Sequence, residues 1–174
     1  MSVSLILLPL GLAAAGMIGI KEVEKADQLE LEKLRAKKQK EVATDSIEKE
    51  VSKPLHWYAM ETRMKDLSMI GNSLDNLGCL YQSIDDLIAF RWREKDCFLR
   101  QNEAGLYEAI FNDLVTVEVA QKIVAEVQEE YTKVLQAQVY TKLLAKAEER
   151  GLILESEEIE ADNSVLLTFS VQGR

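Results

Sequence analysis

A run of eighteen residues without a charge, from Val3 to Ile20, constrains this chain more than any other feature of its sequence. The run reads VSLILLPLGLAAAGMIGI, and Lys21 follows it directly. As a helix rising 1.5 Å per residue, it would extend about 27 Å. The hydrocarbon core of a bilayer is roughly 30 Å thick. The stretch therefore predicts a hydrophobic helix over residues 1–20 that anchors the chain in a membrane.

The flanking charges predict how such an anchor is oriented. No lysine or arginine precedes the stretch, whereas seven lie between Lys21 and Lys40. Basic flanks of a membrane span remain in the cytoplasm. We therefore expect a single-pass membrane protein whose globular domain is cytoplasmic.

Two other interpretations of the stretch stay open. The three alanines before Gly16 fit the small residues of a signal-peptide cleavage site, although the preceding MSVS lacks the usual positive charge. A buried helix in a soluble assembly would also account for the apolar run. Gly11, Ala15 and Gly19 recur every four residues. They would form a smooth stripe at which a second helix could pack, so they are candidates for self-association.

Residues 21–53 form a connector of a different composition. They contain no glycine or proline, and nine basic residues balance nine acidic ones. Glu, Lys, Leu and Ala favour helices, but the apolar stripe is too thin for a coiled-coil seam. The connector predicts a solvated helical stalk or a partly disordered linker.

Residues 54–174 carry the patterns of a globular domain. Period-two and period-3.6 patterns predict strands and helices in turn, and Gly78, Gly105 and Gly151 mark expected element ends and turns. The expected elements are a strand in 55–62, a helix capped by Asp66, strands in 88–92, 97–100 and 106–111 with a turn at Lys95-Asp96, a helix over 120–147, and a C-terminal hairpin around 161–164. The order predicts an α+β fold, in which an antiparallel sheet carries two helices on one face.

Charge and the rarer residue types exclude several classes of function. The net charge of −9 falls entirely within residues 54–174, and an acidic domain repels phosphate backbones, so nucleic-acid binding is not expected. Cys79, Cys97 and His56 have no zinc-ligand spacing. No glycine-rich phosphate-binding motif is present. We expect no metal, no cofactor and no catalytic residues, with both cysteines reduced and packed.

The remaining candidates for chemistry are one histidine and three arginines. His56 could act as an acid–base group, but no nucleophile lies in an activating motif near it, and a polar histidine at a strand edge is the favoured explanation. Arg91, Arg93 and Arg100 lie on neighbouring predicted strands and could bind an anion. Cross-strand pairing with glutamates is the alternative, the expected partners being Glu94, Glu103 or Glu108.

Three stretches of the globular part carry a resemblance to a known family. They are TRMKDLSMIGNSLDNLG, FLRQNEAGLYEAIFND and QVYTKLLAKAEERGLILESEEIEADNSVLLTFS, within residues 60–171. This part resembles the family named hypothetical chloroplast reading frame thirty-five, from cyanobacteria, plastids and other bacteria. That family has no established activity, and its genes often lie near one for an AAA-type ATPase. The resemblance implies an accessory role beside such a partner. The hydrophobic stretch and the connector are a departure from it.

Three hypotheses of function follow. The first is a membrane-tethered accessory protein without catalysis, which binds a protein partner through a sheet edge or a helix face. The second is a small ligand-binding or enzymatic domain with a pocket between sheet and helices. The third is a self-assembling structural subunit that forms homo-oligomers through its first helix.

Overall fold

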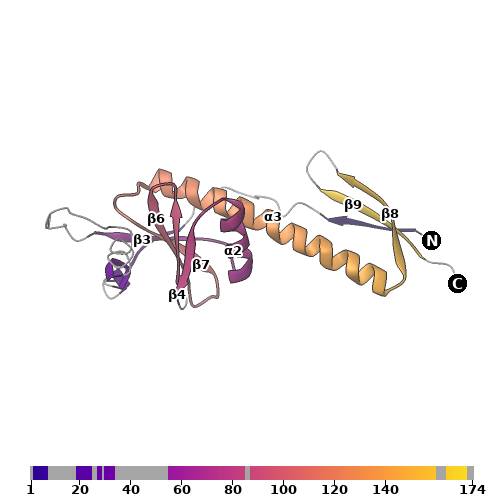
Figure 1. The fold of residues 1–174 in the computed structure, drawn as a ribbon, viewed down its shortest axis with the longest axis horizontal. Helices are drawn as coiled ribbons and strands as arrows, with labels where there is room; N and C mark the ends of the chain where they lie inside the picture. Colours follow the sequence, from indigo (N-terminus) through magenta and orange to yellow (C-terminus); the bar gives the residue numbers. More distant parts are fainter. Residues whose placement is uncertain are drawn as a thin grey trace. The chain divides into compact units, whose positions relative to one another are not determined.

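Antiparallel sheets and α-helices make up the structure, a computed structural model that describes residues 2–7, 19–24, 27–28, 30–33, 55–84, 87–159 and 164–171 (Figure 1). The chain divides into two units, one of residues 16–128 and one of residues 1–15 with 129–174. Helix α3, Val117–Glu149, contributes to both. The predicted α+β class is confirmed, but its single sheet is replaced by two. The predicted globular range, 54–174, contributes residues to both units.

The larger sheet has six strands in the order β2-β3-β7-β6-β5-β4, all antiparallel. Its strands are β2 Ile20–Glu22, β3 Trp57–Glu61, β4 Tyr81–Ile84, β5 Leu87–Trp92, β6 Lys95–Gln101 and β7 Tyr107–Asn112.

Local turn chemistry determines the hairpins of this sheet. In the β6–β7 turn Gly105 has φ +74°, and the Asn102 side chain accepts hydrogen bonds from two backbone N–H groups. The turn expected at Lys95-Asp96 is wrong by two residues. It lies at Arg93-Glu94, where Arg93 adopts φ +54°.

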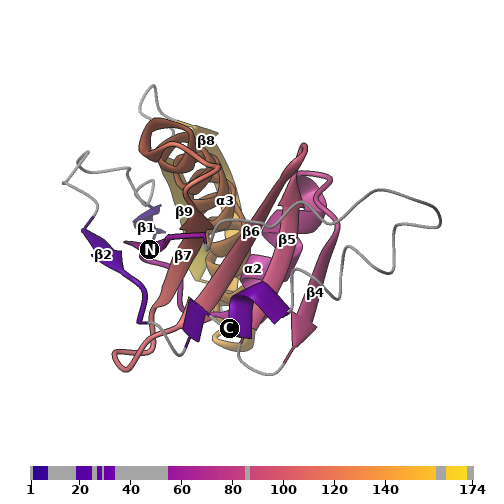
Figure 2. The same cartoon turned by 90° about the vertical axis from the view of Figure 1, so that its left-hand side faces the viewer.

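One face of the six-stranded sheet is covered by α2, Leu67–Asn76, and by the first half of α3 (Figure 2). The predicted cap of α2 is confirmed, since Asp66 Oδ1 accepts a hydrogen bond from Met69 N–H at 3.0 Å. Gly78 follows α2 with φ +68°. The buried side chains of α2 include Ile70 and Leu74, both fully inaccessible to solvent. This is the helix-covered face that the sequence predicted.

The opposite face of the sheet is covered by the beginning of the connector. Val23 and Leu31 are buried there, at 7% and 2% exposure, together with side chains of the sheet: Trp57, Ala59, Leu87, Ala89, Phe98 and Ile110. Residues 27–28 and 30–33 are helical, as expected. The expectation of a solvated stalk is wrong for this part, because β5 is apolar on both faces and each face has to be removed from water.

The described residues of the N-terminal stretch do not show the hydrophobic helix expected over residues 1–20. The two ends of the stretch are strands: β1, Ser2–Leu7, and β2, which begins at Ile20. β1 pairs with β9, Val165–Val171, from Ser2 opposite Ser170 to Leu7 opposite Val165. Residues 8–18, with Gly11 and Ala15, lie outside the described residues. Among the described residues, no helix combines the length and hydrophobicity needed to cross a bilayer.

The smaller sheet has the order β1-β9-β8, with β8 formed by Leu152–Ile159. Gly151, with φ +68°, ends α3 and starts β8, as predicted. The second half of α3 packs on this sheet through an apolar cluster that consists of Tyr140, Leu143, Leu144, Ala147, Leu152, Leu154, Val165, Leu167 and Phe169.

Replacing Leu31 with alanine tests whether the connector is part of the core. We expect Leu31→Ala to lower the free energy of unfolding in urea by about 2 kcal/mol, because a buried side chain is truncated. Its neighbour Glu30 is exposed, so Glu30→Ala serves as the control, with a change within about 0.5 kcal/mol. Equal effects of the two substitutions would contradict the burial of Leu31 and favour a solvated stalk.

Candidate functional site

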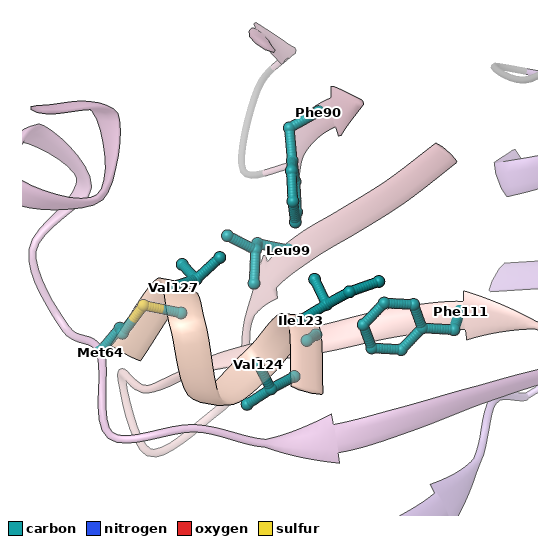
Figure 3. A pocket seen from close by; sticks show the side chains of 8 residues that line it. Met64, Phe90, Leu99, Phe111, Ile123, Val124 and Val127 are labelled. Atoms are coloured by element: carbon teal, nitrogen blue, oxygen red, sulfur yellow. The ribbon is translucent and has the colours of Figure 1, made fainter. Parts of the chain in front are cut away.

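The cavity between the six-stranded sheet and α3 is a feature of the core and not a ligand pocket. Its volume is about 10 Å³, roughly the space of one water molecule. Figure 3 shows its lining side chains facing one another from α3 and the sheet. All are apolar, namely Met64, Phe90, Leu99, Ala109, Phe111, Ile123, Val124 and Val127. An apolar space of this size stays dry. It contains neither His56 nor any of the candidate arginines.

His56 lies just before β3 with an exposed side chain. Its carbonyl oxygen accepts a hydrogen bond from Asp113 N–H at 2.9 Å, which extends the pairing of β3 with β7 beyond the last ladder residues. The residue therefore has a backbone role at the sheet end.

The three candidate arginines do not converge. Arg100 NH2 lies 2.9 Å from Asp27 Oδ2, which ties β6 to the connector. Arg91 Nε lies 3.4 Å from Asp96 Oδ1, its cross-strand neighbour. Arg93 is exposed in the turn. Cross-strand pairing of the kind expected occurs at Arg91, but its partner is Asp96 and not one of the three glutamates considered above.

A charged cluster lies on the face of the six-stranded sheet that the connector covers, beside the buried side chains on that face. Lys21 Nζ lies 2.7 Å from Glu61 Oε1 and 3.5 Å from Glu108 Oε1. The hydrogen bond to Glu61, and then the charges of Glu108 and Glu61, raise the pKa of the Lys21 ammonium. Asn102 Nδ2 donates to Glu108 Oε1 at 2.9 Å. The cluster is internally paired, which is typical of a structural ion-pair network.

Gly19 stands next to this cluster and not on a helix. Its carbonyl accepts a hydrogen bond from Glu61 N–H at 3.2 Å, one step beyond the β2–β3 pairing. A Cβ on Gly19 would lie 3.0 Å from the Glu61 carboxyl group.

Tyr58, Cys79 and Cys97 are ionisable groups that the fold removes wholly or partly from solvent. Tyr58 donates to the carbonyl oxygen of Val115 at 2.6 Å. Burial, and to a smaller degree the charges of Cys97 and Glu118, raise the pKa of Tyr58 to about 12. Cys79 and Cys97 are buried thiols that form no disulfide with each other, and burial raises the pKa of Cys79. These are packed groups and not activated nucleophiles.

Within the described ranges, no three His, Cys, Asp or Glu side chains lie close enough together to hold a metal ion. The Trp57 indole is buried at 1% exposure, and no described group accepts a hydrogen bond from its Nε1. Trp57 packs edge-on against Phe98, with ring centroids 5.6 Å apart. The apolar surroundings make it a core residue.

The edges of the two sheets differ in charge. One edge strand of each sheet carries charges: β2 has Lys21 and Glu22, and β8 has three glutamates and an irregularity between Leu154 and Ser156. Charged side chains and bulges keep an edge from pairing with further strands. The opposite edges, β4 and β1, contain no charged residue. The two uncharged edges are the surfaces best suited to accept another strand.

The β4 edge, defined as Leu80–Ile84, has the most exposed apolar side chain of the described residues. Leu80 is 82% exposed and Ile84 is 38% exposed. The Tyr81 side chain reaches towards α2, where a Cβ on Gly71 would meet Tyr81 Oη at 2.7 Å. Gly71 therefore makes room for the tyrosine that holds β4 against α2.

Comparisons with protein-family models, with curated proteins and with solved structures gave no match. The candidate site therefore rests on the geometry alone. Sequence reasoning missed the β4 edge because no strand was expected at residues 81–84, although two apolar residues flank an uncharged Gln-Ser pair there.

The half-buried Tyr58 phenol gives a prediction for alkaline pH. The folded pKa of Tyr58, about 12, exceeds the usual value near 10. Its stabilising contribution is therefore complete below pH about 10 and is lost as the pH rises towards about 12. We expect wild-type stability in urea to fall between pH 9 and pH 11.5 by about 1–2 kcal/mol more than that of Tyr58→Phe.

The control for this prediction is Tyr140→Phe. The pKa of Tyr140 is raised mainly by its hydrogen bond to Glu157, and burial contributes less. Its removal should leave most of the alkaline loss in place. If Tyr58→Phe and the wild type lose stability in parallel, the half-buried phenol does not cause the loss.

Proposed function

We propose that this chain is an accessory protein that binds a protein partner by strand addition at the β4 edge. The observation that carries the proposal is an uncharged edge strand flanked by a leucine that is 82% exposed. Strand addition is a common mode of peptide recognition, in which main-chain hydrogen bonds give affinity and alternate side chains give specificity.

The hydrogen-bonding pattern of β4 identifies the backbone groups that a partner would use. Arg91 N–H donates to the Leu80 carbonyl oxygen at 3.0 Å, so these two residues form a hydrogen-bonded antiparallel pair. Such pairs alternate along a ladder. The backbone groups of Gln82 and Ile84 therefore point towards β5, while those of Tyr81 and Ser83 point outward to the open edge.

Side chains next to the edge indicate the chemistry of the partner. Leu80, Gln82 and Ile84 share one face of the sheet, because side chains alternate along a strand. An added segment would place its own alternate residues beside them. We expect an extended segment with apolar residues four positions apart, next to Leu80 and Ile84. The net charge of −9 favours a partner with basic residues around that segment.

The AAA-type ATPase implied by the family resemblance remains a proposed partner. A subunit of such an enzyme qualifies if it contains a segment of this kind and if its binding depends on Ser83. Proteins that bind elsewhere on the chain would be retained when the β4 edge is altered.

The membrane location also stays a prediction. Washing membranes with carbonate strips peripheral proteins and leaves integral ones in place. Recovery of the full-length chain in the membrane pellet would support an anchor. Its release into the wash would reject one, and neither result bears on strand addition at β4.

Proline at position 83 tests the proposed edge directly. Ser83→Pro removes an outward N–H and leaves the pairing of β4 with β5 intact, since edge strands tolerate proline at such positions. We expect recovery of the partner from the native host to fall at least tenfold, which corresponds to about 1.4 kcal/mol. The measurement is a quantitative pull-down with tagged full-length chain.

Ser83→Ala is the matched control, because it removes the hydroxyl group and keeps the N–H. Leu80→Asp tests the side-chain part of the same surface and should reduce recovery as well. Unchanged recovery with Ser83→Pro, in a protein that keeps the wild-type urea midpoint, would rule out strand addition at β4.

A further inference from the structure

The second uncharged edge strand, β1, exposes several apolar side chains to solvent. Its six residues read SVSLIL. Val3, Leu5 and Ile6 are 46%, 42% and 64% exposed. β1 pairs with β9 on one side, and no described strand pairs with its other side. An uncharged edge of this length with exposed apolar side chains readily pairs with another strand.

Helix α3 leaves the apolar side chains of β1 uncovered. Val3 lies opposite Phe169, and Leu5 lies opposite Leu167. Residues directly opposite each other share a face of the sheet, so Val3 and Leu5 are on the helix side. Phe169 and Leu167 are nevertheless buried at 1% or less. The cluster formed by α3 includes residues of β8 and β9 and none of β1.

We propose that a second copy of this chain covers the β1 edge. The two β1 strands pair antiparallel about a twofold axis at Leu5 and join two three-stranded sheets into one sheet of six strands. The two α3 helices then flank the paired β1 strands on the same face. This association involves the smaller sheet alone and is independent of the partner proposed at β4.

Side-chain matching argues for self-pairing in this register. Residues that face each other across the axis have to lie on the same face of the joined sheet, so their numbers must sum to an even value. With Leu5 on the axis, Leu5 meets Leu5 of the second copy, and Val3 meets Leu7 of the second copy. Ser4 meets Ile6 of the second copy. Every pair on the helix side is apolar, and no charge is opposed.

The charged edge of the same sheet is a poor alternative. Pairing β1 with β8 of another copy would place the glutamates of β8, at positions 155, 157 and 158, beside apolar side chains. The irregularity between Leu154 and Ser156 would interrupt the new ladder. Such head-to-tail pairing also continues without end. Pairing about a twofold axis closes after two copies and avoids all three problems.

The strength of the association can be bounded. A single strand pair buries less than the roughly 1,200 Å² that stable complexes require. We therefore expect a dissociation constant in the micromolar range. Sedimentation of the full-length chain from about 1 to about 300 µM should show a monomer–dimer equilibrium. A monomer throughout this range would overturn the proposal and leave the edge to other partners.

Two lysine substitutions separate β1 from β8. Leu5→Lys would place two like charges at the axis, and we expect the association constant to fall at least tenfold. Ile153→Lys, at a residue of β8 with a similar exposure of 47%, should leave it unchanged. An unchanged constant for Leu5→Lys, or a matching loss for Ile153→Lys, would overturn the proposal.

Cysteine cross-linking tests the register of the two paired β1 strands, and it does so without a measured dissociation constant. In the proposed register the two Leu5 Cα atoms are about 4.5–5.5 Å apart, within disulfide range. The two Ser4 residues are diagonal neighbours at about 7–8 Å, which is too far. Under oxidation Leu5→Cys should yield covalent dimer, and Ser4→Cys should yield much less. The native thiols are buried at 9% and 0% exposure, so wild-type protein is the background. Preferential cross-linking at position 4 would overturn this register.

Discussion

The larger unit depends on a sheet whose faces both have to be removed from water. Leu87, Ile88, Ala89 and Phe90 are all buried in β5, so neither face can be left to solvent. α2 and the first half of α3 cover one face. The other face is closed by Val23 and Leu31, which come from a segment of nearly balanced charge. The ion pair of Arg100 with Asp27 and the bonds of Lys21 to Glu61 and Glu108 hold this segment over the sheet.

The sequence predicted the elements whose causes are local. Asp66, Gly78, Gly105 and Gly151 act through their own backbone and side-chain chemistry, so both ends of α2, the C-terminal end of α3 and the turn at Gly105 were correctly expected. The apolar run at the N-terminus has a non-local cause. Whether Val3–Leu7 forms a helix or a strand depends on β9, more than 150 residues away along the chain. An eighteen-residue hydrophobic window contains no information on that pairing, and its length suggested a membrane helix.

The candidate site was less predictable than the fold, because chemical reactivity guided the choice of residues. His56 and the three arginines were selected for what their side chains can do, but an ion pair within the sheet accounts for Arg91 and one with the connector accounts for Arg100. The features that distinguish β4 and β1 are the lack of charge and the position at a sheet edge. The lack of charge can be read from the sequence. The position at a sheet edge can be known only from the strand order, which follows from long-range pairing.

The two uncharged edges have complementary consequences because they belong to different sheets. An edge that pairs with itself sets the number of copies, whereas an edge that accepts a foreign strand sets the partner. A dimer formed at β1 would present two β4 edges. A partner with two suitable segments would then bind the second one at a high effective concentration, and its apparent affinity would exceed that of a single edge without new contacts. A short β4 strand, weak by itself, would in this way suffice for stable recruitment. Charged β2 and β8 complete the arrangement, since they limit each sheet to one added strand.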